Sequence, residues 1–118
     1  MAEAQRILLV EDEYMIAQDM AYELTALGAD VVGPAASVER ALRLIEEDPA
    51  IDTGLLDLNL NGERAYPIAE ALLARGARVV FTTGYDETAI DPRYAHVPRC
   101  SKPVTRSALK QMLSADQA

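Results

Sequence analysis

Several side chains that could handle a metal ion and a phosphoryl group stand at the ends of short apolar segments. Glu11 and Asp12 directly follow one apolar run, and Asp57 follows another. Thr83 and Lys102 come at the ends of two more. Carboxylates that lie close together repel one another unless a cation or a proton neutralises them. An all-oxygen set of this kind suits Mg²⁺, which binds one or two carboxylates and keeps several waters.

These residue types predict phosphoryl chemistry if the fold brings them together. A carboxylate beside Mg²⁺ can attack a phosphoryl group and become an acyl phosphate. The metal and an ammonium group such as that of Lys102 would neutralise the transferring oxygens. The predicted strands and helices must therefore position these side chains at one place.

Short apolar runs alternate with helical patterns along the chain. Gly28 and Gly76 end two of the predicted helices, and Ser37 and Thr105 are suitable caps for the start of two others. Residues 86–90 could form a short or mobile fourth helix, which Pro92 would end. The predicted strands lie around residues 7–10, 30–34, 52–57, 77–83 and 97–101, and residues 58–62 are expected to form a loop.

This alternation predicts an α/β fold with a doubly wound, five-stranded parallel sheet and helices on both faces. Ligands of such sheets bind beyond the carboxyl ends of the strands, at the point where the strand order reverses. The acids, the threonine and the lysine stand at those ends, so we expect one shared site.

Four segments closely resemble the marker segments of bacterial response-regulator receiver domains in two-component systems. The resemblance covers nearly the whole chain and implies the flavodoxin-like receiver fold, with strand order 2-1-3-4-5. We therefore expect residues 1–118 to form a single receiver domain, with no output domain after Ala118. The segments are Leu8-Leu9-Val10-Glu11-Asp12-Glu13, Leu55-Leu56-Asp57-Leu58-Asn59-Leu60, Phe81-Thr82-Thr83-Gly84 and Lys102-Pro103.

The resemblance implies a metal site formed by four residues. By this resemblance Asp57 is the phosphoacceptor and a ligand of Mg²⁺. Asp12 would be a direct Mg²⁺ ligand and Glu11 would act mainly through metal-bound water. Asn59 would offer its backbone carbonyl.

The resemblance also assigns two residues to the phosphoryl group itself. Thr83 would hydrogen-bond the phosphoryl group and Lys102 would pair with it, across a cis Lys102–Pro103 bond. The chain would catalyse only its own phosphorylation and dephosphorylation. The implied partners are a sensor histidine kinase or a histidine phosphotransfer protein, and a downstream protein target.

The switch region departs from the family pattern. Many receivers have an inward-turning aromatic residue where this chain has Arg99, whose guanidinium is costly to bury unpaired. Our hypothesis is that phosphorylation draws Thr83 inward and reorders the following segment, with Tyr85 as a replacement ring that also shields the acyl phosphate from water. The Phe81–Tyr85 stretch further resembles the Phe-Ala-Thr-Gly signature subgroup of alphaproteobacteria, except at Thr82.

Composition indicates which classes of partner and which compartment fit this chain. Nineteen acidic against eleven basic residues give a formal charge of −8, which argues against binding to nucleic acid or to an anionic membrane. The N-terminus lacks the pattern of a secretory signal, and a single cysteine, Cys100, fits a reducing compartment, so we expect a cytoplasmic protein. Cys100 is interpreted as a small core residue and His96 as a surface residue.

Two alternatives remain at this point. An aspartyl-nucleophile phosphatase usually has a second acid two residues after the nucleophile, where this chain has Asn59. A phosphorylation-independent binding module of the same fold would not need the acids, Thr83 and Lys102 together.

Overall fold

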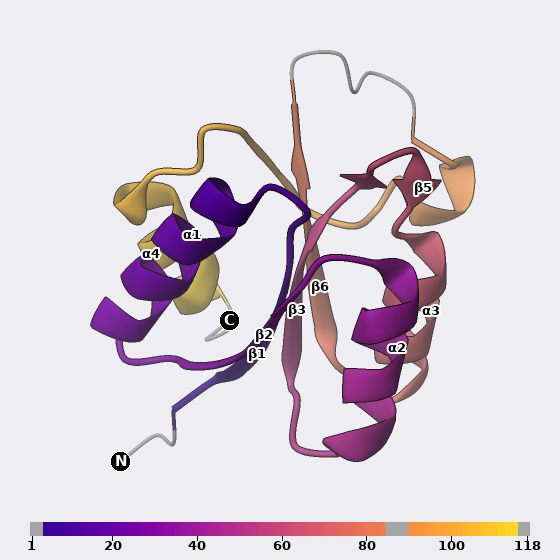
Figure 1. Ribbon diagram of the computed structural model, residues 1–118, viewed down its shortest axis with the longest axis horizontal. Helices are drawn as coiled ribbons and strands as arrows, with labels where there is room; N and C mark the ends of the chain where they lie inside the picture. The colour runs from indigo at the N-terminus through magenta and orange to yellow at the C-terminus, as the bar shows by residue number, and fades with distance from the viewer. Residues whose placement is uncertain (1–3, 85–89, 116–118) are drawn as a thin grey trace.

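Five parallel strands form the centre of the computed structural model, which describes residues 4–84 and 90–115. The spatial order is β2-β1-β3-β6-β7, which confirms the predicted order of the five sheet strands (Figure 1). The strands are β1 (Arg6–Val10), β2 (Asp30–Ala35), β3 (Thr53–Asp57), β6 (Arg78–Thr83) and β7 (Arg99–Ser101).

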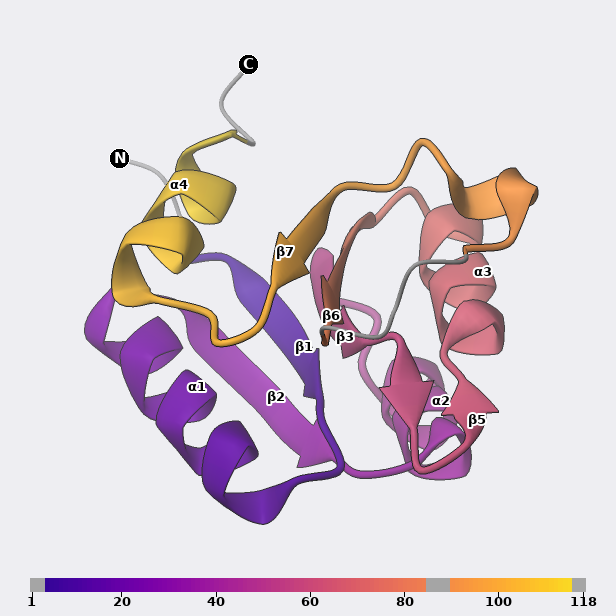
Figure 2. The same ribbon diagram turned by 90° about the horizontal axis from the view of Figure 1, so that it is seen from above.

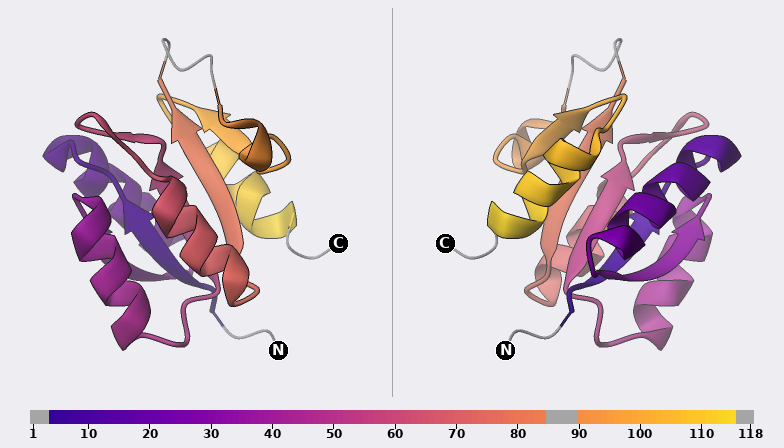
Figure 3. Two further views of the ribbon diagram at one scale, coloured as in Figure 1. Left: turned by 90° about the vertical axis from the view of Figure 1, so that its right-hand side faces the viewer. Right: turned by 90° about the vertical axis from the view of Figure 1, so that its left-hand side faces the viewer.

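Helices cover both faces of this sheet. Helices α1 (Tyr14–Ala26) and α4 (Arg106–Ala115) pack on one face, and α2 (Val38–Glu47) and α3 (Tyr66–Ala74) pack on the other (Figure 3). Each face has its own apolar core. Consecutive strand residues point to opposite faces, so Leu55 faces α1 and α4 while Leu56 faces α2 and α3. Burial on both faces is the physical reason why the strands are continuous apolar runs rather than alternating ones.

The predicted helix signals match the structure. The Ser37 hydroxyl accepts a hydrogen bond from the Arg40 N–H at 3.1 Å, and the Thr105 hydroxyl accepts one from the Ala108 N–H at 3.1 Å. Gly28, with φ 95°, follows the end of α1 in the left-handed region that favours glycine. Local capping chemistry therefore fixes where these helices begin and end.

The segment after Asp57 differs from the predicted loop. Residues 58–62 are not simply irregular, because β4 (Asn59–Leu60) pairs antiparallel with β5 (Glu63–Arg64). Asn61 and Gly62 connect them with φ values of 57° and 98°. Two positive φ values in a two-residue Asn-Gly connection define a type I′ hairpin, and this local signal was missed in the sequence prediction.

Two further predictions concern the last third of the chain. The fifth strand of the sheet spans Arg99–Ser101 and begins two residues later than predicted. The predicted fourth helix at residues 86–90 and Tyr85 lie outside the described residues, apart from Ile90, and a short 3₁₀ helix, η1 (Pro92–Tyr94), follows. Within residues 4–84 and 90–115, no helix combines the length and apolar character needed to cross a bilayer.

Candidate functional site

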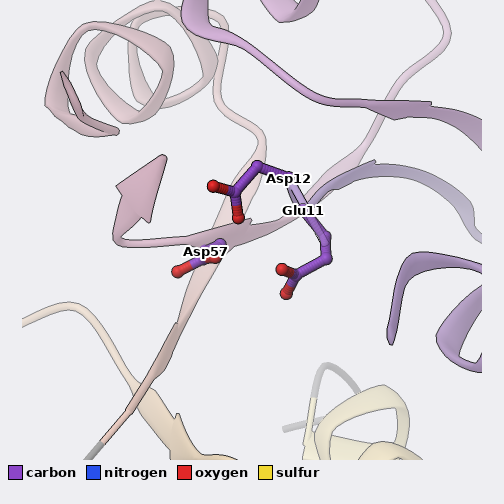
Figure 4. A group of neighbouring side chains, drawn as sticks. All are labelled: Glu11, Asp12 and Asp57. Carbon is purple, nitrogen blue, oxygen red and sulfur yellow. The ribbon is translucent and has the colours of Figure 1, made fainter. Parts of the chain in front are cut away.

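The predicted site residues meet at the carboxyl edge of the sheet. Asp57 is the last residue of β3, Thr83 is the last residue of β6, and Glu11 directly follows β1. Figure 4 shows the carboxylates of Glu11, Asp12 and Asp57 gathered beside one another. Strand order reverses between β1 and β3, so the acids lie at the position where ligands bind in doubly wound sheets.

The three acids form a compact oxygen cluster. One carboxylate oxygen from each of Glu11, Asp12 and Asp57 lies within 4.8 Å of the other two. Glu11 and Asp57 are 2% and 5% exposed, whereas Asp12 is half-buried. This donor set consists of hard oxygen atoms with an accessible side, which fits a divalent cation such as Mg²⁺ that retains water ligands.

Lys102 joins two of these acids. Its Nζ atom lies 2.8 Å from Oε1 of Glu11 and 3.0 Å from Oδ2 of Asp57. Burial alone would lower the pKa of Lys102, but its hydrogen bonds to the two carboxylates outweigh burial and raise that pKa. The ammonium is therefore charged at neutral pH and compensates part of the negative charge of the cluster. The Lys102–Pro103 bond is cis, as predicted.

The electrostatic environment of Asp57 differs from that of an exposed aspartate. Burial raises the pKa of Asp57 to about 6, although the hydrogen bond from Lys102 opposes the shift. Two smaller effects contribute to the same value: the neighbouring charge of Glu11 also raises the pKa, and the Asn59 N–H lowers it by donating to Oδ1 at 3.1 Å. The ionised Asp57 is thus incompletely compensated, and additional positive charge at the cluster would favour its nucleophilic form.

Thr83 and Asn59 border the cluster in different ways. Thr83 is 6% exposed, and its carbonyl accepts a hydrogen bond from the Lys102 N–H at 2.8 Å, which ties the end of β6 to the lysine. The Asn59 side chain accepts a hydrogen bond from the Gly62 N–H at 2.9 Å. The amide oxygen of Asn59 is therefore engaged in the β4-β5 hairpin rather than directed at Asp57.

Three other residues considered in the sequence analysis lie outside the cluster: Arg99 and His96 are on the surface, and Cys100 is partly buried against the core. Arg99 is exposed in β7, in agreement with the expectation that its guanidinium does not occupy an apolar slot. His96 is an exposed turn residue. Cys100 is half-buried against the core beneath α1 and α4, and burial raises the pKa of its thiol, which disfavours the thiolate.

Sequence reasoning missed two aromatic residues that pack against β6, the strand that ends at Thr83. The rings of Tyr66, at the start of α3, and Tyr94, in η1, stack with centroids 4.8 Å apart. Both rings also contact Phe81 of β6, the strand that ends at Thr83. The positions of Tyr66 and Tyr94 along the chain do not predict their stacking. The stack forms because α3 and η1 pack on the same face of the sheet.

Comparison with known proteins identifies the class of molecule. No family model matches the chain. The sensory transduction protein LytT of Bacillus subtilis is 30% identical over 89 residues, which cover 72% of this chain and 36% of LytT. The chain thus spans about a third of the length of this curated relative.

Solved structures extend the match to the whole chain. The solution structure of SdrG from Sphingomonas melonis Fr1 is 37% identical, with a TM-score of 0.86 and full coverage of both chains. The receiver domain of the hybrid histidine kinase CckA is 28% identical, with a TM-score of 0.77, and the match covers 96% of this chain and 99% of that domain.

The chain belongs to the response-regulator receiver domains. It is a phosphoryl-accepting domain of two-component signalling, and its role is in signalling rather than in metabolic catalysis. Receiver domains interact with histidine kinases and with downstream effectors, and they bind Mg²⁺ at an acidic site such as the cluster described above. The relatives favour this prediction over the phosphatase and over the phosphorylation-independent module.

Proposed function

We propose that Asp57 is the phosphoryl acceptor of a single receiver domain formed by residues 1–118. The observation that carries this proposal is the convergence of three carboxylates and the Lys102 ammonium at the carboxyl ends of β1, β3 and β7. Asp57 combines deep burial, a raised pKa and an ammonium in direct contact, which are features of a functional carboxylate rather than of a surface acid.

In the proposed reaction, an ionised oxygen of Asp57 attacks the phosphorus atom of the donor. A phosphorus–oxygen bond forms, the bond to the donor atom breaks, and the donor takes up a proton. Lys102 leaves its direct contact with Asp57 and pairs with the transferred phosphoryl oxygens, and the Thr83 hydroxyl donates a hydrogen bond to them. These contacts place positive charge and a donor where negative charge develops.

The metal in this proposal is Mg²⁺. Asp12 and Asp57 would bind it through their carboxylates and Asn59 through its backbone carbonyl, while Glu11 would contact metal-bound water. Bound Mg²⁺ would supply positive charge to the transferring oxygens and would favour the ionised form of Asp57. The close approach of the three carboxylates supports this assignment, because such a cluster is unfavourable without a cation.

The chain would catalyse only the formation and the hydrolysis of its own acyl phosphate. Asn59 stands where a phosphatase would need an acid to protonate a leaving group, and its side chain is engaged in the hairpin. Multiple turnovers of a phosphate ester by catalytic amounts of the protein would contradict this part of the proposal.

The donor would be a sensor histidine kinase or a histidine phosphotransfer protein, and phosphorylation would change binding to a downstream protein. The acidic balance of the chain supports a protein partner rather than nucleic acid or a membrane. The single cysteine, Cys100, fits a reducing compartment, which supports a cytoplasmic location for this interaction. Thr83 links the acceptor region to β6, so it is the proposed first element of the switch.

The test is incubation with a small phosphodonor and Mg²⁺, followed by intact-mass measurement. Wild type should gain one phosphoryl group, and Asp57→Asn should gain none. Asp30→Asn is the matched control, because Asp30 is an exposed acid at the start of β2, at the amino edge of the sheet. Equal labelling of wild type and Asp57→Asn would place the acceptor elsewhere.

A further inference from the structure

Three aromatic rings from separate elements pack together, and one of them, Phe81, lies on the strand that carries Thr83. Tyr66 and Tyr94 stack with an interplanar angle of 5°. Phe81 meets Tyr66 edge-on at 6.1 Å and Tyr94 at 6.5 Å, with interplanar angles of 78° and 77°. Stacked and edge-on pairs with these geometries attract one another in addition to burying apolar area. The cluster therefore joins α3, β6 and η1.

Tyr66 also makes a directional contact with the chain that enters η1. Its hydroxyl oxygen accepts a hydrogen bond from the Asp91 N–H at 2.8 Å. Asp91 in turn accepts a hydrogen bond from the Arg93 N–H at 2.9 Å, and the Arg93 guanidinium lies 5.4 Å from the centre of the Tyr94 ring. Figure 2 shows the turn containing η1 next to α3. Tyr66 thus holds the start of η1 against the start of α3.

Backbone hydrogen bonds connect the same helix end to Asp57. Leu58, the residue after Asp57, donates its N–H to the Thr82 carbonyl at 3.0 Å. The carbonyl of Leu58 accepts the Ala65 N–H, also at 3.0 Å, and Ala65 immediately precedes Tyr66. A displacement of the chain at Asp57 or at the end of β6 would therefore reach the first turn of α3 within two hydrogen bonds.

Phe81 provides a second connection, between the end of β6 at Thr83 and the two tyrosine rings. Phe81 and Thr83 are two residues apart in β6, so their side chains point to the same face of the sheet. Phe81 is fully buried, and its edge contacts both tyrosine rings. Because a packed interior changes between discrete arrangements rather than deforming continuously, a shift of β6 that accompanied an inward movement of Thr83 would act on the ring cluster through Phe81.

The partner of Phe81 across the sheet cannot supply the moving ring. Arg99 pairs with Phe81 in the β6-β7 register and is exposed. We propose that Tyr66 is the positioning residue of the switch: its stack on Tyr94 and its hydrogen bond to Asp91 stabilise η1 in the arrangement in which Lys102 contacts the free carboxylate of Asp57. Phosphorylation would shift this equilibrium and displace the surface formed by residues 91–95. This inference rests on the proposed function.

Thermodynamic linkage predicts the direction in which loss of the Tyr66 contacts changes the affinity for a phosphoryl analogue. If the Tyr66 contacts favour the arrangement with a free Asp57 carboxylate, their removal lowers the cost of switching and raises the affinity for a phosphoryl analogue. Loss of one neutral hydrogen bond of ordinary net strength corresponds to about a fivefold change. A residue that only supports the fold would change thermal stability without changing this affinity.

The experiment is a titration of the full chain with beryllofluoride in the presence of Mg²⁺, followed by amide proton–nitrogen spectra. The variants are Tyr66→Phe, which keeps the ring and removes the hydroxyl, and Tyr66→Leu, which also removes the stack. Tyr22→Phe is the matched control, because Tyr22 is 70% exposed on α1. In wild type, the amides of Asp91 and of residues 93–95 should shift when the analogue binds; Pro92 has no N–H and gives no signal.

We expect Tyr66→Phe to bind beryllofluoride about five times more tightly than wild type, Tyr66→Leu to bind more tightly still, and Tyr22→Phe to match wild type. Unchanged or weaker affinity in Tyr66→Phe overturns the inference, even if Tyr66→Leu does not fold. The inference is also overturned if the amides of Asp91 and of residues 93–95 do not respond to beryllofluoride in wild type. Normal phosphodonor labelling of wild type in those cases would leave the proposed function intact, whereas absence of labelling and of beryllofluoride binding in wild type would remove both.

Discussion

The Nζ atom of Lys102 lies 3.0 Å from Oδ2 of Asp57, and these two residues are 45 positions apart in the chain. The same Nζ atom contacts Glu11 at 2.8 Å. One ammonium thus partly neutralises two buried carboxylates, while the pKa of Asp57 remains raised to about 6. This charge balance favours the approach of a cation, or of a phosphoryl group that Lys102 can contact.

Replacing Lys102 with Ala should slow labelling of Asp57 by a small phosphodonor about 10- to 100-fold. The variant loses a charge-assisted hydrogen bond to the transferring group, which is worth about 1.5–3 kcal/mol. The rate can be followed by intact mass at saturating Mg²⁺. Lys110→Ala is the control, because Lys110 is an exposed lysine on α4. A wild-type rate in Lys102→Ala would exclude Lys102 from the transfer step.

Without divalent metal, the Asp57 carboxyl should titrate with a pKa of about 6, which carboxyl-carbon NMR in EDTA can measure. Because the folded state then binds this proton more tightly than the unfolded state, the contribution of Asp57 to the free energy of unfolding should decrease as the pH rises from about 4 to about 6.

Asp57→Asn should lose this part of the pH dependence, as measured by denaturant unfolding in EDTA. Saturating Mg²⁺ should lower the midpoint of the Asp57 titration in wild type, because the cation and the proton compete for the carboxylate. A midpoint near 4 in EDTA would show that burial and Glu11 do not control Asp57.

Replacing Asp12 with Asn should weaken Mg²⁺ binding by at least about tenfold. Loss of an outer-shell contact alone typically weakens metal binding about 10- to 100-fold, and a direct ligand should matter at least as much. The increase in melting temperature with added Mg²⁺ measures the affinity. Asp19→Asn provides the comparison, since Asp19 is an exposed acid on α1. Equal Mg²⁺ dependence in the two variants would count against Asp12 as a ligand.

Replacing Gly54 with Ala should lower the free energy of unfolding by about 1–3 kcal/mol. A Cβ atom at Gly54 would clash with Cδ1 of the fully buried Leu72, so the Leu72 side chain would have to shift within a packed core. Urea unfolding measures the change. Gly84→Ala is the matched control, because a Cβ at Gly84 meets nothing within 4 Å. Equal stability of the two variants would mean that the β3–α3 contact adapts easily.

Local sequence signals determined much of the fold. Apolar runs with both faces buried predict parallel strands, and Ser37 and Thr105 cap helices where their side chains predict. The hairpin after Asp57 was also encoded locally by Asn61-Gly62, but it was missed because the segment was interpreted only as a loop. The carboxyl ends of parallel strands lie at one edge, so the positions of Glu11, Asp57 and Thr83 followed from the strand pattern.

The sequence by itself therefore determined the alternation of strands and helices and the residues that meet at the site, and its resemblance to receiver domains implied the strand order. Only the tertiary structure decided how they meet: that Lys102 contacts both Glu11 and Asp57, and that Tyr66 stacks on Tyr94. Periodicity and capping depend on neighbours along the chain, whereas these contacts depend on the packing of side chains from separate elements. Their geometry is fixed by the assembled core and is not expressed in any local pattern.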